Sequence, residues 1–453
     1  MPKTCIIGAG VTGLSTAWQL KKSGEEILVL ESHKEVGGAI QSINNTGYLV
    51  EEGPNSIQLK SRQIEEFLNS IPGLREQMID AESDAKNRFI VRNNRPCPVP
   101  RGPIELLSTP LWSKLGCLHV LAELFKVKRS DENEESVADF SRRRLGHEFY
   151  DYAINPLIGG IYAGNPEELS IRYAFPRLYA LENEYGGLIR GMIAKLISRR
   201  KESAYKYSKR IISFKDGLST LPKLIAQALG DSIHLGIKIN SIESIKNKWI
   251  IKWDNQYEQF DRLIVTVPAH ALGKLPFNND LKNKFSQFCG IDHPPLSVLT
   301  VGFKREHIKH PLDGFGLLVP ESEKRTILGV LFPSSIFKGR APKGEVLLTV
   351  FFGGERNPDY ATENTEKALA TAMPEINSIL GVIGPPTFVH LKYWKKAIPQ
   401  YKIGYGRYFE ALNLIEEKYT GIHILGNYRN GISLDDCLSS SIKFGTKIYN
   451  EII

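Results

Sequence analysis

The chain has 453 residues, of which 42% are hydrophobic and 24% are charged. This composition excludes a disordered or fibrous protein and predicts a large core with more than one lobe. Lys and Arg number 58 against 50 Asp and Glu, and the resulting net charge of +8 is too diffuse to indicate a nucleic-acid-binding protein. The five cysteines are scattered without metal-ligand spacing, so we predict reduced thiols and no metal.

The N-terminal stretch predicts a β-α-β unit. An apolar strand at 3–7 runs into Gly8-Ala9-Gly10-Val11-Thr12-Gly13, which fits G-x-G-x-x-G, and a helix then leads to a strand at 27–30 that ends at Glu31. In this motif Gly8 permits a tight turn, Gly10 lets a pyrophosphate approach the start of the helix, and Gly13 lets helix and strand pack closely. Glu31 can accept hydrogen bonds from a ribose. We therefore predict a dinucleotide site; the alternative is a glycine turn that serves only packing.

A second glycine pair, Gly37-Gly38, follows Glu31 closely and favours a flavin over a nicotinamide nucleotide. It resembles the longer fingerprint of FAD oxidases of the amine-oxidase superfamily. That pattern often has an arginine shortly after the glycine pair. This chain has Ala39-Ile40-Gln41-Ser42 there, so Gln41 is expected to offer a neutral hydrogen bond instead.

The sequence turns helical between about residues 103 and 210. The segment 104–129 has apolar residues at helical spacing, is interrupted by Pro110, and carries Lys114, Lys126, Lys128 and Arg129. Spacing alone favours a pair of core-facing amphipathic helices, and a surface that dips into a membrane interface is the alternative.

Strand patterns return after residue 233. Strands at 296–303, 314–319, 327–332 and 346–352 predict a mostly antiparallel sheet, and a strand at 422–427 leads into a C-terminal helix at 435–449. We predict an α/β protein, α+β overall. Residues 1–85, 211–270 and 404–453 form a Rossmann-like FAD-binding domain, 86–210 a helical, membrane-docking insertion, and 271–403 a substrate-binding domain.

Several motifs resemble the oxygen-dependent protoporphyrinogen oxidases, FAD enzymes of late haem synthesis, nearly end to end. They are Glu51-Glu52-Gly53-Pro54-Asn55-Ser56, Asn87-Arg88-Phe89, Tyr162-Ala163-Gly164-Asn165-Pro166, Gly314-Phe315-Gly316-Leu317-Leu318, Leu328-Gly329-Val330-Leu331-Phe332, Ile398-Pro399-Gln400-Tyr401 and Gly431-Ile432-Ser433-Leu434-Asp435-Asp436-Cys437. The resemblance implies that a porphyrinogen reduces FAD by hydride transfer and that molecular oxygen reoxidises it, giving hydrogen peroxide.

The same resemblance implies roles for individual residues. Arg88 would pair with a propionate, and Leu318, Leu331 and Phe351 would form apolar walls around the pyrrole rings. Gly164 would leave space beside the macrocycle, and Asn55 would orient substrate or stabilise charge near the flavin. The implied FAD contacts are Gly8, Ala9, Gly10, Val11, Thr12, Gly13, Glu31, Ser32, Gly53, Pro54, Asn55, Ser56, Ile239 beside the adenine, Ile432, Ser433 and Leu434.

Other functions stay open at this point. Related enzymes oxidise coproporphyrinogen III, and an amine oxidase or desaturase would use the same fold; an amine oxidase needs an aromatic cage, for which Tyr428 is the only nearby candidate. A redox-silent flavin-binding protein is a further alternative. The expected partners are a porphyrinogen, oxygen, a membrane surface, ferrochelatase by pathway order, and a second copy of the chain. The first strand begins two residues after Met1, so we expect no signal or transit peptide and a cytoplasmic protein, peripheral on the cytoplasmic membrane.

Overall fold

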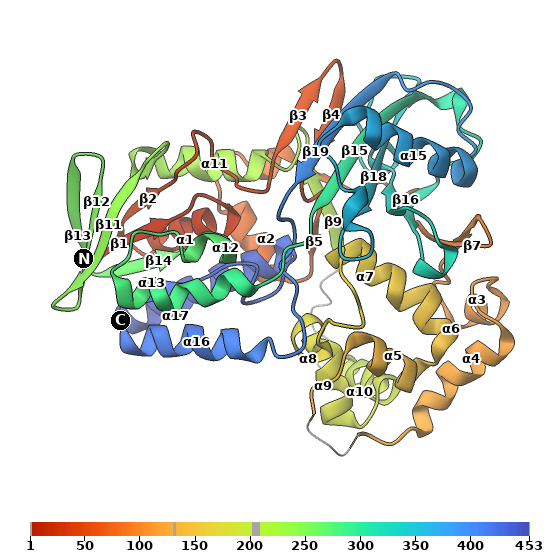
Figure 1. The fold of residues 1–453 in the computed structure, drawn as a ribbon, viewed down its shortest axis with the longest axis horizontal. Coiled ribbons are helices and arrows are strands. Elements are labelled where there is room, and N and C mark those ends of the chain that lie inside the picture. The colour runs from red at the N-terminus through yellow and green to blue at the C-terminus, as the bar shows by residue number, and fades with distance from the viewer. Residues whose placement is uncertain (1, 130–132, 202–208, 453) are drawn as a thin grey trace.

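The computed structural model describes residues 2–129, 133–201 and 209–452. A parallel sheet and its helices occupy the left of Figure 1, a seven-stranded sheet the upper right, and the helices α3 to α10 the lower right. The predicted α/β class, with a Rossmann-like part, an antiparallel sheet and a helical region, is confirmed.

The parallel sheet assembles strands from distant parts of the chain. Its order is β10 (Ile233–His234), β2 (Glu26–Leu30), β1 (Lys3–Ile7), β14 (Arg262–Val265) and β20 (Ile422–Ile424), with every pairing parallel. Helix α1 (Val11–Lys22) follows β1, and α17 (Leu434–Ile452) follows β20. The two helices pack side by side, and Ser441 Oγ of α17 donates to the Thr12 carbonyl of α1 at 3.1 Å. Because the strands are parallel, both helices start at the same edge of the sheet.

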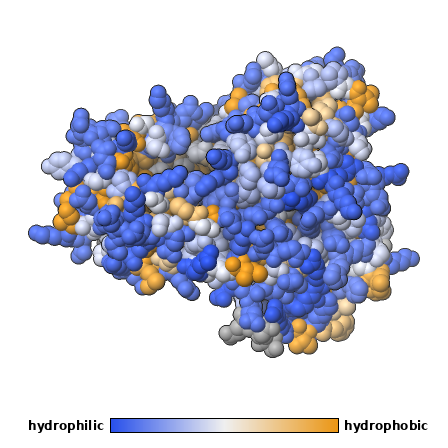
Figure 2. Space-filling model, viewed as in Figure 1, coloured by the Kyte–Doolittle hydropathy of each residue, from blue (hydrophilic) through white to orange (hydrophobic). Residues whose placement is uncertain are grey.

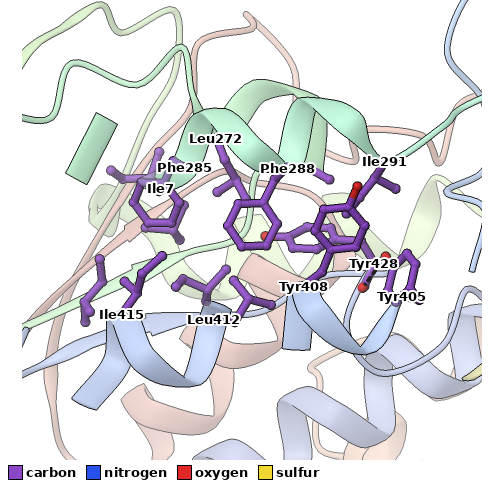
Figure 3. Packing of buried hydrophobic residues seen from close by; sticks show 14 of the residues in the cluster. Ile7, Leu272, Phe285, Phe288, Ile291, Tyr405, Tyr408, Leu412, Ile415 and Tyr428 are labelled. Atoms are coloured by element: carbon purple, nitrogen blue, oxygen red, sulfur yellow. Dashed lines mark hydrogen bonds between the residues drawn. The ribbon is translucent and has the colours of Figure 1, made fainter. Parts of the chain in front are cut away.

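Helices and a β-meander complete this lobe. Antiparallel β11 (Ile239–Ile245), β12 (Lys248–Trp253) and β13 (Gln256–Phe260) form a separate sheet, and Lys246 and Asn247 both have positive φ in the tight hairpin turn between the first two. Figure 3 shows α13 (Asn279–Ser286) and α16 (Gly406–Lys418) packed across a layer of aromatic and aliphatic side chains.

The seven-stranded sheet is antiparallel except for one pairing. Its order is β19 (Phe388–Trp394), β15 (Leu296–Lys304), β18 (Glu345–Gly353), β17 (Ile327–Leu331), β16 (Gly314–Leu318), β7 (Asn87–Arg92) and β8 (Arg95–Pro98), and only β16 and β7 run parallel. The sheet takes β7 and β8 from the range 86–210 and adds a strand, β19, that the sequence patterns did not predict. Helix α15 (Thr365–Leu380) packs on one of its faces.

The remaining elements connect these layers. Two small sheets contain β3 (Ser42–Asn45) with β4 (Tyr48–Glu51), and β5 (Ile57–Leu59) with β9 (Arg210–Phe214) and β6 (Met78–Asp80). The other helices are α2 (Arg62–Asn69), α6 (His147–Phe149), α8 (Ile171–Ala174), α11 (Thr220–Leu229), α12 (Ala269–Leu272) and α14 (Pro333–Ile336).

The helical region leaves many apolar side chains in solvent. It contains α3 (Pro103–Ser108), α4 (Lys114–Leu121), α5 (Val137–Leu145), α7 (Asn155–Tyr162), α9 (Pro176–Tyr185) and α10 (Leu188–Lys201). As predicted, α3 and α4 form a pair broken near Pro110. The core-facing interpretation of this segment is wrong for Leu115, Leu118, Leu121 and Phe125, which are exposed, although Leu111 and Trp112 are buried.

Charged groups, by contrast, are buried inside this region. Arg144 on α5 is fully buried and forms ion pairs with Glu123 and Glu182. Glu123 also accepts the N–H groups of Leu188, at 2.7 Å, and Ile189, at 2.9 Å, at the start of α10. The network therefore fixes α5, α9 and α10 to the turn that follows α4.

Replacing Arg144 by alanine should destabilise this region by about 3 kcal/mol, because it leaves buried carboxylates without their cation. Arg142 on the same helix provides the control, since its partner Glu167 is exposed and Arg142→Ala should cost less than about 1 kcal/mol. Thermal unfolding of both variants, with limited proteolysis of the helical region, checks this. Equal losses of stability would contradict the role of the buried network.

Candidate active site

The glycine turn after β1 is shaped by close contacts at two of its glycines. Gly8 has φ of +109°, and a Cβ on Gly13 would lie 2.0 Å from the Gly8 carbonyl oxygen. A Cβ on Gly10 would meet no atom of the described residues within 4 Å. Gly8 and Gly13 therefore serve the turn and the helix packing, whereas Gly10 borders open space at the start of α1, as a pyrophosphate cradle requires.

The second glycine pair lies directly against this turn. The Gly37 N–H donates to the Ala9 carbonyl at 2.8 Å, and a Cβ on Gly38 would lie 3.4 Å from Gly10 Cα. Both residues have positive φ, +113° and +60°. The two glycine segments thus form one surface of bare backbone, and no described side chain caps the first turn of α1. Its free N–H groups suit an anion.

Glu31 directly follows β2 and lies beside the same turn. Its carboxylate accepts the N–H of Ala9 at 2.7 Å and that of His33 at 2.9 Å, and Ser32 Oγ donates to it at 3.1 Å. Burial raises its pKa, but these hydrogen bonds outweigh burial and the net pKa lies below the usual value. Glu31 is therefore an ionised acceptor. The Ile237 N–H donates to the Glu31 carbonyl at 2.9 Å, which brings the strand that begins at Ile239 to the same place.

The loop after β4 approaches the glycine pair. A Cβ on Gly53 would lie 2.1 Å from the Ala39 carbonyl oxygen, so only glycine fits there. Pro54, Asn55 and Ser56 are half-buried. The Asn55 side-chain amide donates to the Gly53 carbonyl at 3.1 Å, which fixes the turn.

The loop before α17 completes this edge. Tyr401 Oη donates to the Asn427 carbonyl at 2.5 Å and accepts the Gly431 N–H at 3.1 Å, which holds the half-buried segment Ile432, Ser433 and Leu434 in place. Asp435 pairs with Lys60 at 2.9 Å, yet its Oδ1 is buried and has no partner among the described residues. An acceptor of this kind fits a hydroxyl-bearing ligand.

One face of the seven-stranded sheet carries the predicted substrate residues. Strand register places Arg88, Leu318, Leu331 and Phe351 on the same face, opposite the face covered by α15. Leu318, Leu331 and Phe351 are half-buried, whereas their neighbours Leu317, Val330, Val350 and Phe352 on the other face are fully buried. We call Leu318, Leu331 and Phe351 the apolar face.

Arg88 stands at the β7 end of this face. Its side chain is exposed, and its guanidinium lies 5.3 Å from the centre of the Phe315 ring. No carboxylate of the described residues forms an ion pair with it. A planar guanidinium without a counter-ion is suited to binding an incoming carboxylate.

Gly164 lies against Gln400 and not, as the resemblance had implied, beside open space for a macrocycle. A Cβ there would lie 2.2 Å from Gln400 Oε1, so the space beside Gly164 is filled by protein. Gln400 Nε2 in turn donates to the Tyr162 carbonyl at 2.8 Å. Gly164 therefore joins α7 to the 398–401 motif, and its missing side chain leaves no space for a macrocycle on that side.

Tyr428 does not contribute to an aromatic cage. Its ring is buried in the core with Tyr405, Tyr408 and Leu412 (Figure 3). The Tyr428 carbonyl accepts from Tyr405 Oη at 2.7 Å. Its aromatic surface is thus used for packing beneath the site.

Comparison with known proteins identifies the family. A model of the flavin containing amine oxidoreductases matches residues 11–443. The chain belongs to this family. Protoporphyrinogen oxidase 2 of Arabidopsis thaliana is 32% identical over 477 residues, which cover 97% of this chain and 92% of the plant protein.

Two further proteins are similar to this chain over nearly its whole length. Coproporphyrinogen III oxidase of Staphylococcus aureus is 27% identical, over 96% of each chain. A crystal structure from Exiguobacterium sp. 255-15 has a TM-score of 0.80 over 99% of both chains at 22% identity, which shows the shared fold. As a member of this family the chain is an FAD-dependent oxidoreductase, and the open glycine turn, the ionised Glu31 and the unpaired Asp435 Oδ1 fit that cofactor.

Alanine substitution should separate the roles of two glycines in the turn. Gly10 has an extended conformation that alanine adopts freely, so Gly10→Ala should leave the melting temperature of the apoprotein unchanged while weakening FAD at least tenfold. Gly13→Ala should prevent folding, because its Cβ collides with backbone. Flavin fluorescence titration and thermal unfolding check this. An unchanged FAD affinity in Gly10→Ala would contradict the placement of the pyrophosphate at this turn.

Proposed function

We propose that the protein oxidises protoporphyrinogen IX to protoporphyrin IX, with oxygen as the final acceptor. The observation that carries this proposal is the apolar face beside the cofactor edge, with one unpaired arginine at its end, in a chain whose similarity to protoporphyrinogen oxidases runs nearly end to end. A porphyrinogen is apolar at its ring and anionic at its propionates, so the two surfaces match.

The residues of this chain bind and orient the substrate. From β7 to β18 the strands span about 14 Å, since neighbouring strands lie about 4.8 Å apart. A tetrapyrrole whose propionate pairs with Arg88 can therefore lie over Leu318, Leu331 and Phe351. Bound FAD supplies the two-electron acceptor that takes a hydride from the substrate and passes the electrons to oxygen. Asn55, on the loop at the cofactor edge, remains our candidate for orienting the substrate.

Coproporphyrinogen III is the second candidate substrate, because a relative named for that activity also matches along its whole length. It carries more carboxylates than protoporphyrinogen. Among the described residues on this side of β7, β16, β17 and β18, Arg88 is the cation without a carboxylate partner; Arg92 pairs with Glu148 at 2.8 Å. This charge pattern favours the substrate with fewer carboxylates. The buried Tyr428 argues against an amine substrate.

Arg88→Ala should raise KM for protoporphyrinogen at least tenfold, because one charge-assisted contact is lost, and should leave the FAD-to-protein ratio unchanged. Arg95→Ala, an exposed arginine in the same hairpin, is the matched control. Porphyrin fluorescence in air gives the rates, and wild-type protein is also offered coproporphyrinogen III. Loss of flavin with unchanged KM would contradict the role of Arg88, and faster oxidation of coproporphyrinogen III would reverse the substrate assignment.

We further propose that the helical region attaches the protein to a membrane surface. The exposed residues Ile104, Leu115, Leu118, Phe125 and Val127 lie in this region, the last two at 82% and 86% exposure, with Met192, Ile193, Leu196 and Ile197 on α10. Figure 2 shows hydrophobic residues at the lower edge of the molecule over α4 and α10. None of the described helices is long and apolar enough to span a bilayer, so the contact would be interfacial.

Basic residues lie beside the exposed apolar residues of the helical region. Lys114 and Lys128 flank it and favour anionic lipids. We propose attachment to the cytoplasmic membrane from the cytoplasm. A homodimer and delivery of the porphyrin to ferrochelatase stay predictions.

Phe125→Glu should reduce co-sedimentation with vesicles of mixed neutral and anionic lipid at least tenfold, because the charged side chain opposes insertion of the exposed ring. Ile383→Glu replaces a residue that is 67% exposed on another part of the molecule and serves as the control. Both variants should keep wild-type activity on dissolved substrate. If the two variants sediment equally, the apolar residues of the helical region are not the membrane contact.

A further inference from the structure

Strand β19 presents a row of functional side chains that the established activity does not explain. His390, Lys392 and Trp394 alternate along it and share one face. His390 Nε2 contacts Glu52 Oε1 at 2.8 Å, Lys392 Nζ donates to Glu52 Oε2 at 2.8 Å, and Trp394 Nε1 donates to the Glu52 carbonyl at 2.8 Å. All of them therefore converge on the residue that directly precedes the Gly53–Ser56 loop.

Lys392 also reaches the glycine pair. Its Nζ donates to Gln41 Oε1 at 2.8 Å, and Gln41 Nε2 donates to the Gly38 carbonyl at 3.2 Å. Gly38 in turn lies against Gly10, where the phosphate cradle opens. A lysine 351 positions away in the sequence therefore reaches this segment.

The strand register places this charge on the side of the apolar face. Lys392 pairs with Val298 and Val298 with Phe351, so the three side chains lie on one face of the sheet. Two strand spacings, about 10 Å, separate Lys392 from Phe351. Lys392 thus stands between the glycine turn and the apolar face, at the junction of the two halves of the site.

Neutralisation of Glu52 alone would be a simpler role for this lysine. Glu52 is largely buried, and burial raises its pKa, but contacts with His390 and Lys392 outweigh burial and leave the pKa lowered. The carboxylate is therefore charged, and removing Lys392 would remove its ion pair with the lysine ammonium and leave the contact with His390. In either role the lysine sets the net charge beside the Gly53–Ser56 loop, and that net charge changes the relative binding of oxidised and reduced flavin.

We propose that Lys392 is a positioning residue that fixes both cofactor loops against the apolar face and holds a positive charge at the junction of the cofactor edge and that face. This inference rests on the FAD chemistry of the family and not on which porphyrinogen is oxidised. Reduced flavin carries more negative charge than oxidised flavin, so a cation at this point favours reduction.

The test is the midpoint potential of the flavin in purified holoenzyme without any porphyrinogen. Lys392→Met should bind reduced FAD at least tenfold less tightly relative to oxidised FAD, which lowers the potential by about 30 mV for a two-electron couple. Lys392→Gln keeps a hydrogen-bonding side chain without the charge and should shift the potential equally with a smaller loss of stability. Lys392→Arg should restore most of the wild-type value.

Lys395→Met, which removes an exposed lysine from the segment directly after β19, is the matched control and should leave the potential unchanged. A wild-type potential in both Lys392→Met and Lys392→Gln, whatever their melting temperatures, would overturn the proposal, as would an equal shift in Lys395→Met. Because no porphyrinogen is present, a wrong substrate assignment would not affect the result.

Discussion

Parallel pairing of β1 with β14, and of β14 with β20, makes one edge from three distant parts of the chain, and the whole site depends on that edge. Thr266, just after β14, donates to the carbonyls of Ile7 and Gly8 at 3.0 Å each, and a Cβ on Gly8 would lie 2.8 Å from its hydroxyl. The glycine turn is therefore closed by a side chain some 250 residues away. The α17 loop, held by Tyr401, then meets the same edge.

The two faces of the seven-stranded sheet differ in how completely they are buried. The face under α15 is fully packed and supplies hydrophobic stabilisation, about 25 cal/mol for each Å² of apolar surface removed from water. The other face keeps Leu318, Leu331 and Phe351 half-buried. The apolar area that remains exposed there is the area that the proposed substrate would cover, so the proposal assigns the same type of residue to folding on one face and to binding on the other.

The sequence predicted best those elements that depend on residues close together in the chain. The β-α-β unit and its glycines follow from local turn and packing rules, and the sheet strands follow from apolar runs separated by turns. Strand β19 was missed because its charged residues His390 and Lys392 face the site and not bulk solvent, so the pattern does not resemble a buried strand. Helix α16 carried a usable signal, Tyr408, Leu412 and Ile415 at helical spacing. The neighbour of Gly164 could not be predicted, because Gln400 reaches it only through tertiary packing.

The helical region combines buried charge with exposed hydrophobicity, the reverse of an ordinary water-soluble domain. Arg144, Glu123 and Glu182 hold the helices together from inside. A polar network of this kind gives rigidity without using apolar side chains, which leaves Leu118 and Phe125 free at the surface. If lipid covers these residues, their side chains are not exposed to water. The desolvation of the buried charges then remains as an unfavourable term in the free energy of the region. Under the proposed attachment to a membrane surface, the buried network and the exposed apolar residues would have one common explanation.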